Sequence, residues 1–179
     1  MSDRRTMPVL LLAVLSAFTA QQVLTPVLAP LARAIGLSEV ALGSIITVAA
    51  IVFAGTALAW GRAVDRFGRR AVLLTGMGLG LAGMAGFAVV AQLAVQRAIG
   101  PETAFVLMLA TRSVLFGAGI GAVPVAAIAF VAATTAGRDD DGAARTSGIG
   151  RIGAVQGLSL VLGPAIGGLL AAAGLLGPV

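Results

Sequence analysis

Residues 40–96 read VALGSIITVAAIVFAGTALAWGRAVDRFGRRAVLLTGMGLGLAGMAGFAVVAQLAVQ, a pattern in which two uncharged runs enclose a short basic segment. The first run covers 22 residues at 40–61, and the second covers 26 residues at 71–96. A helix needs about 20 apolar residues to cross the hydrocarbon core of a bilayer. The pattern therefore predicts two antiparallel membrane-spanning helices that are joined by a tight turn.

The rest of the chain repeats this pattern of long uncharged runs. Its 179 residues are 59% hydrophobic and 11% charged, with a mean hydropathy of +1.05. A soluble domain has about 45–50% apolar and about 25% charged residues. We therefore predict an all-α membrane protein in which residues 1–179 form a single transmembrane helical bundle. The five predicted spans are residues 8–31, 39–60, 71–95, 103–133 and 149–173.

The composition excludes several classes of function. The sequence has no Cys and no His, so thiolate and imidazole metal sites are excluded. It also contains no cluster of catalytic side chains, so we do not predict an enzyme. We expect no metal and no cofactor. The net charge of +5 comes from Arg residues that lie mainly at the ends of spans, where the bilayer places them. We therefore predict no binding to nucleic acid.

The distribution of Arg residues predicts the orientation of the chain in the membrane. With the N-terminus in the cytoplasm, nine Arg residues fall on the cytoplasmic side, and only Arg33 and Arg97 fall outside. Cytoplasmic loops carry the excess of positive charge, so the N-terminus is predicted to be cytoplasmic and the C-terminus, after five spans, to lie outside. We expect a bacterial plasma membrane. The nine residues are Arg4, Arg5, Arg62, Arg66, Arg69, Arg70, Arg138, Arg145 and Arg151.

The N-terminal residues also have features of a signal peptide, because Arg4 and Arg5 precede an apolar run. The run continues to Leu31, however, and Phe18 occupies a position where cleavage requires a small residue. A first transmembrane helix is therefore favoured.

The basic segment GRAVDRFGRR at 61–70 resembles motif A of the major facilitator superfamily, G-x-x-x-D-R-x-G-R-R, at every defining position. Gly61 and Gly68 allow a tight reversal of the chain, and Asp65 can pair with a neighbouring Arg or lie at a helix N-terminus. In this family, motif A contacts a helix of the second half of the transporter. The alternative is a basic loop that only follows the charge rule. The matching residues are Gly61, Asp65, Arg66, Gly68, Arg69 and Arg70.

The fifth span resembles motif C of the same family, G-x8-G-x3-G-P-x2-G-G, with Ser159 in place of one glycine. Gly163 and Gly167 form a small-xxx-small face, and Pro164 removes one backbone donor, so the segment can pack closely and bend. In the family, this motif is associated with antiporters. An ordinary packing motif is the alternative. The matching residues are Gly150, Ser159, Gly163, Pro164, Gly167 and Gly168.

Arg112 is the only charged residue that lies away from the ends of the predicted spans. An unpaired cation within a bilayer costs at least about 2.5–3.5 kcal/mol, so a functional role is one hypothesis, and a snorkelling or structural Arg is the other. The position resembles the Arg of the family's motif B, R-x-x-x-G. Here, however, five steps separate Arg112 from Gly117, and Phe116 stands where the family has Gln. Ser113 is the alternative counterpart of that Arg.

Polar side chains in the first span predict part of a cavity lining. Gln21, Gln22 and Thr25 lie in its outer half, and hydrogen bonds between helices are the alternative role. No Asp or Glu lies within a predicted span except Glu39 at the very start of the second, so the interior of these spans offers no evident carboxylate for a proton relay.

The resemblance extends from the first span to the fifth and implies a proton-coupled efflux antiporter. Its partners would be the lipid bilayer, a small-molecule substrate and protons. Complete members have twelve or more spans in two six-span halves. We therefore expect an incomplete six-helix N-terminal bundle that lacks the second half and does not transport alone. The alternative is a small integral membrane protein that associates with a partner chain and performs no transport of its own.

Single cysteines test the predicted orientation, because the chain has no Cys of its own. A cysteine at position 100 should react with a membrane-impermeant maleimide in intact cells. A cysteine at position 141 should react only after the membrane is permeabilised. The reverse labelling pattern would show that the orientation is inverted.

Overall fold

The computed structural model describes residues 3–136 and 141–172, and this part of the chain is almost entirely helical and contains no strand. The elements in chain order are α1 (Asp3–Val23), α2 (Thr25–Ala34), α3 (Glu39–Phe67), α4 (Arg69–Val95), α5 (Pro101–Met108), the π-helical segment η1 (Leu109–Leu115), α6 (Phe116–Thr135) and α7 (Asp141–Ala172).

Five helical segments in the described part of the chain are long and apolar enough to cross a membrane, which confirms the predicted all-α membrane fold. α1 and α2 together form the first span, and α5, η1 and α6 together form the fourth. Large apolar side chains cover the outside of the bundle: Val40, Leu81 and Leu169 are 81%, 73% and 72% exposed. Such a surface is stable in hydrocarbon, where every backbone group is satisfied within its own helix.

The helices extend beyond the predicted spans. α3 continues into the basic segment as far as Phe67, and α7 begins at Asp141, before residue 149, where the fifth span was predicted to begin. Residues 137–140 lie outside the described part. Hydropathy marks only the part of a helix that lies in hydrocarbon, and charged residues are compatible with helix where it leaves the membrane.

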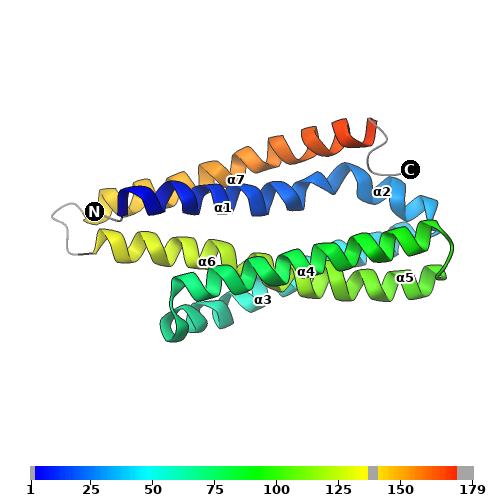
Figure 1. Cartoon of the computed structure of the whole chain (residues 1–179), viewed down its shortest axis with the longest axis horizontal. Helices are drawn as coiled ribbons and strands as arrows, with labels where there is room; N and C mark the ends of the chain where they lie inside the picture. Colours follow the sequence, from blue (N-terminus) through cyan, green and yellow to red (C-terminus); the bar gives the residue numbers. More distant parts are fainter. Residues whose placement is uncertain (1–2, 137–140, 173–179) are drawn as a thin grey trace.

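The spans run antiparallel, so their ends alternate between two ends of the bundle (Figure 1). The start of α1, the turn from α3 to α4, the end of α6 and the start of α7 lie at one end. The opposite end holds α2, the connection from α4 to α5, and the end of α7. The basic segments of α3, α4 and α7 therefore share one end, as the charge pattern requires for a common side of the membrane.

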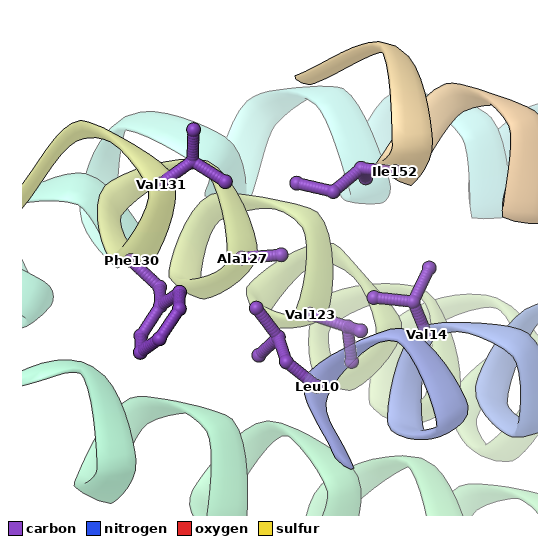
Figure 2. Close-up of a cluster of buried hydrophobic side chains, with 7 residues drawn as sticks. All are labelled: Leu10, Val14, Val123, Ala127, Phe130, Val131 and Ile152. Atoms are coloured by element: carbon purple, nitrogen blue, oxygen red, sulfur yellow. The ribbon is translucent and has the colours of Figure 1, made fainter. Parts of the chain in front are cut away.

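α6 is the central helix of the bundle and packs against α1, α3, α4 and α7. An apolar cluster holds α6 to the first halves of α1 and α7, with side chains from all three helices directed toward one another (Figure 2). A helix that is apolar on every side belongs in the interior of a bundle, which agrees with the sequence of α6. The cluster consists of Leu10, Val14, Val123, Ala127, Phe130, Val131 and Ile152.

Small residues bring α4 and α6 into backbone contact. A Cβ added to Gly119 would lie 2.5 Å from the amide nitrogen of Gly80 and 2.7 Å from the carbonyl oxygen of Gly76. Further along the same interface, a Cβ on Gly83 would lie 2.6 Å from the amide nitrogen of Phe116. Lipid provides no hydrophobic drive between helices, so close backbone approach of this kind is a main source of association.

The turn between α3 and α4 depends on one glycine. Gly68 has φ of 85° and is the single residue between the two helices, whereas Gly61 lies inside α3. The sequence predicted that both glycines form the reversal, and the prediction is wrong for Gly61. The start of α3 is as predicted, because the Ser38 hydroxyl accepts a hydrogen bond of 3.1 Å from the amide of Ala41.

Alanine substitutions at two glycines test the packing of α4 against α6. Gly119→Ala should lower the free energy of unfolding by about 1–3 kcal/mol, because the added methyl group meets backbone atoms that cannot move aside. Gly78→Ala is the matched control, because nothing lies within 4 Å of its added Cβ, and it should leave stability unchanged or raise it. Unfolding in mixed micelles can be followed by the fluorescence of Trp60, the only Trp. Equal effects of the two substitutions would contradict this account.

Candidate functional site

A cavity of about 280 Å³ lies between α1, α3 and the continuous helix formed by η1 and α6. Its wall combines three aromatic rings and several aliphatic side chains with two polar side chains. The lining residues are Phe18, Gln21, Ile46, Ala49, Ala50, Phe53, Arg112, Phe116, Gly117 and Ile120.

Arg112 is the charged residue of this cavity. It is only 8% exposed, and its Nε atom is buried without a hydrogen-bond partner among the described residues. Its guanidinium carbon lies 4.7 Å from the centroid of the Phe116 ring, so the cation is in contact with an aromatic face. This contact contributes about 0.5–2 kcal/mol and leaves the charge without a counter-ion among the described residues. Arg112 is therefore a buried cation whose N–H donors form no hydrogen bond to a described residue.

Gln21 supplies the second polar group of the cavity, from the α1 side. Its Oε1 atom is buried and accepts no hydrogen bond from a described residue, and the Oγ1 atom of Thr19, two residues earlier, is in the same state. Thr19 does not line the cavity, whereas Gln21 and Arg112 do. Buried polar atoms are nearly always hydrogen-bonded, so the unsatisfied atoms of these two lining residues indicate a place where a bound molecule makes the missing contacts.

The π-helical segment explains the unusual spacing of the sequence around Arg112. A π-helix bonds residue i to residue i+5, so one of its turns holds one residue more than a motif written for an α-helix assumes. Arg112 and Gly117, five steps apart, accordingly line the same cavity. Such segments occur frequently at functional sites.

Ser113 lies next to Arg112 but has a different environment. It is fully buried, and its hydroxyl donates a hydrogen bond of 2.7 Å to the carbonyl oxygen of Ile45 in α3. A Cβ on Gly117 would lie 3.1 Å from the carbonyl oxygen of Ala49, so α6 and α3 are also in close contact one turn later. These contacts fix the backbone that carries Arg112.

Trp60 reinforces the contact between α3 and α6 near the basic end. Its indole Nε1 donates a hydrogen bond of 2.7 Å to the carbonyl oxygen of Ala118. The indole therefore binds a neighbouring helix, and its polar atom is satisfied within the protein.

The residues that resemble motif A lie at the turn from α3 to α4, away from the cavity. Arg69 lies 5.1 Å from the ring centroid of Phe130 and donates a long hydrogen bond of 3.5 Å to the carbonyl oxygen of that residue in α6. Arg66 lies over its neighbour Phe67. Asp65 and Arg70 are exposed and form no ion pair with a described residue.

The residues that resemble motif C divide into two groups. Ser159, Gly163 and Gly167 are buried, and each faces the first span: the Ser159 hydroxyl lies 3.4 Å from the carbonyl oxygen of Leu15, and Gly163 packs against Gln22. Gly167 packs against Val23 and Pro26, beside the break between α1 and α2. Added Cβ atoms at Gly150 and Gly168 would meet nothing within 4 Å, and Pro164 lies inside α7.

Two other polar residues of the first span lie elsewhere. Gln22 faces α7 at Gly163, and Thr25 is exposed at the start of α2, so neither belongs to the lining that contains Gln21. The aromatic wall, formed by Phe18, Phe53 and Phe116, was not predicted. The sequence held one indication of it: the chain has only seven Phe, and three of them form this wall.

A comparison with protein families matches residues 10–176 to the family described as Major Facilitator Superfamily. The match includes all the cavity residues and almost the whole described part of the chain. Searches of curated proteins and of solved structures returned no match.

Two neighbouring substitutions with effects of opposite sign test whether Arg112 is an unsatisfied cation. Arg112→Met should raise the free energy of unfolding by about 1 kcal/mol or more, because it removes a buried charge with no ionic partner. Ser113→Ala should lower it by about 1 kcal/mol, because it deletes a satisfied buried hydrogen bond. Both values can be measured by unfolding in mixed micelles. A loss of stability in Arg112→Met as large as that in Ser113→Ala would identify Arg112 as a structural residue.

Proposed function

The chain belongs to the Major Facilitator Superfamily, a family of small-molecule membrane transporters, and on this premise we propose that it forms part of a proton-coupled efflux antiporter. The cavity between α1, α3 and α6 lies on the substrate path of this transporter. The observation that carries the proposal is the buried Arg112, which faces the cavity without an ionic partner among the described residues. An intramembrane cation of this kind marks a substrate or ion pathway in membrane proteins.

The antiporter assignment is supported by the small-residue face of α7. Ser159, Gly163 and Gly167 are spaced four residues apart and bring α7 against the first span where α1 gives way to α2. The resemblance to motif C, which is associated with antiporters, lies in the residues that form this contact. Ser159 adds a hydroxyl that is 3.0 Å from the carbonyl oxygen of Val155, so it is accommodated within its own helix.

Proton coupling requires a titratable group on the transport path. The Asp and Glu residues of the five spans lie near the span ends and none lines the cavity, so we place the coupling carboxylate on another part of the transporter. Arg112 would then interact electrostatically with that carboxylate in one state of the transport cycle. Charge pairs of this kind shift a carboxyl group between its protonated and ionised forms.

The exposed part of the α3–α4 turn supports a contact with a second half of the transporter. Asp65 lies in the last turn of α3, where the helix dipole disfavours a carboxylate, and it has no ionic partner in the described part of the chain. A helix N-terminus or a cation from another six-helix half would compensate this charge. We propose that the turn lies on the cytoplasmic side, as the Arg distribution indicates.

The proposed transport can be tested at the native locus, where any further segment or partner of the transporter is retained. Cells that carry the chain should accumulate less of at least one member of a panel of labelled organic anions, cations and neutral compounds than cells in which it is deleted. A protonophore should abolish the difference, because it removes the gradient that drives export. Arg112→Gln should abolish it too, whereas Arg33→Gln, at the far end of α2, should preserve it.

Two outcomes would contradict this function. Equal accumulation of every compound in wild-type and deletion cells would exclude efflux of the compounds tested by a transporter that contains this chain. A difference that persists in the presence of the protonophore would exclude proton coupling.

Association with a partner chain is a second candidate function, and a groove along α1, α4 and α6 favours it. A cavity of about 210 Å³ is lined by small residues of α1 and α4, and a second of about 370 Å³ follows toward the basic end. Small residues on facing helices allow a further apolar helix to approach closely. The small residues of the first cavity are Ser16, Ala17, Ala20, Gly76 and Gly80.

Site-specific photo-crosslinking distinguishes this candidate. A photoreactive residue at Leu81, which lines the groove, should form a crosslink to protein in the native membrane. The same residue at Val106 on α5, which is similarly exposed, should crosslink only to lipid. Crosslinks to lipid alone at both positions would exclude a helix in the groove.

A further inference from the structure

We infer that the cavity at Arg112 is a binding site for a small amphipathic monoanion, a molecule with an aromatic or aliphatic body and one carboxylate or similar anionic group. This inference deepens the proposed function, because it names the class of substrate. It is carried by the charge, the unsatisfied hydrogen-bonding groups and the apolar wall of the same cavity.

The charge of the cavity has one sign. Arg112 is the only ionisable residue in its lining, and the Asp and Glu residues of the five spans lie near the span ends, outside that lining. In a medium of low dielectric constant, an uncompensated cation strongly favours an anion and disfavours a second cation. An organic cation would therefore meet a repulsive charge with no carboxylate to offset it.

The geometry of the guanidinium also favours an anionic oxygen. Nε of Arg112 is buried and unpartnered, and no other nitrogen of this side chain bonds to a described residue. A guanidinium presents its donors in a planar fork that matches the two oxygens of a carboxylate. The Phe116 ring lies 4.7 Å from the guanidinium carbon, and no described residue accepts a hydrogen bond from the donors of this side chain.

The remaining wall selects an apolar body of limited size. Phe18 comes from α1, Phe53 from α3 and Phe116 from α6, so aromatic side chains surround the cavity from all three sides. Aromatic rings stack or pack edge to face with a bound ring, and a volume of about 280 Å³ suits a small organic molecule. Gln21 adds a neutral polar group that can meet a hydroxyl or amide of the ligand.

Fluorine NMR with three probes of similar size tests this inference on the full chain in nanodiscs of zwitterionic phosphatidylcholine. The probes are para-fluorobenzoate, para-fluorobenzamide and para-fluorobenzylammonium, which share one ring and differ in charge. The benzoate signal should broaden in the presence of the protein and remain sharp with empty nanodiscs. The benzylammonium signal should show no protein-dependent broadening. Trifluoroacetate, an anion without a ring, should bind more weakly than the benzoate.

Variants assign the binding to the cavity. Arg112→Gln should weaken benzoate binding at least about tenfold, because charge-assisted hydrogen bonds are lost. Arg112→Lys should retain part of the affinity, since it keeps the charge but loses the planar fork. Arg33→Gln removes an exposed Arg outside the cavity and should have no effect. The unfolding transition of Trp60 fluorescence verifies that each variant is folded.

The inference would be overturned by the absence of protein-dependent broadening of benzoate, by equal binding of benzylammonium, or by undiminished binding in Arg112→Gln. The measurement is made at equilibrium without a proton gradient, so it is independent of transport. Benzoate binding without efflux in the cellular assay would reject the proposed function and retain the anion site. Protonophore-sensitive efflux of cations alone, without benzoate binding, would retain the transporter and reject the anion site.

Discussion

Helices in a bilayer gain little by covering one another's apolar side chains, because hydrocarbon surrounds them on every side. In this bundle, close backbone contact between α4 and α6 provides the association that apolar burial cannot. Gly119 lies against the backbone of Gly76 and Gly80. The same interface continues to Gly83, which lies against the backbone of Phe116 where η1 ends. The placement of the π-helical turn, and hence of Arg112, depends on this line of small residues.

The π-helical turn gives two adjacent polar residues opposite environments. Ser113 is directed into the bundle and bonds to the Ile45 carbonyl, while Arg112 lies at the cavity with no ionic partner in the described part of the chain. A polar side chain within a membrane is stabilising when satisfied and costly when it is not. The hydrogen bond of Ser113 and the close approach of Gly117 to Ala49 hold the backbone in place. They can therefore retain a residue whose own environment is unfavourable until a ligand or counter-charge is bound.

The sequence predicts the number and type of spans because hydropathy acts over about 20 residues at a time, and a single exception such as Arg112 does not alter the sum. Finer features depend on tertiary contacts. Gly61 and Gly68 are equivalent in sequence, and only the structure shows that the turn falls on Gly68. Gln21 and Gln22 are adjacent and chemically identical, yet they face the cavity and α7, respectively. Their directions depend on the rotation of α1, which the small residues of α7 help to determine.

The two walls of the cavity belong to differently packed groups of helices. Gln21 lies on α1, which is held by the small-residue face of α7, whereas Arg112 lies on η1, which is held by α3 and α4. The two groups are joined by the apolar cluster around Val14 and Val123 (Figure 2). They are also joined by a second apolar cluster, in which Leu31 of α2 packs with Ile45, Phe87, Val90 and Met108. Apolar contacts in such a cluster are non-directional and tolerate small rotations better than backbone contacts between glycines do. A rotation of α1 with α7 would therefore shift contacts within these two apolar clusters and move Gln21 relative to Arg112, while the Ser113 hydrogen bond and the glycine contacts that position Arg112 remain.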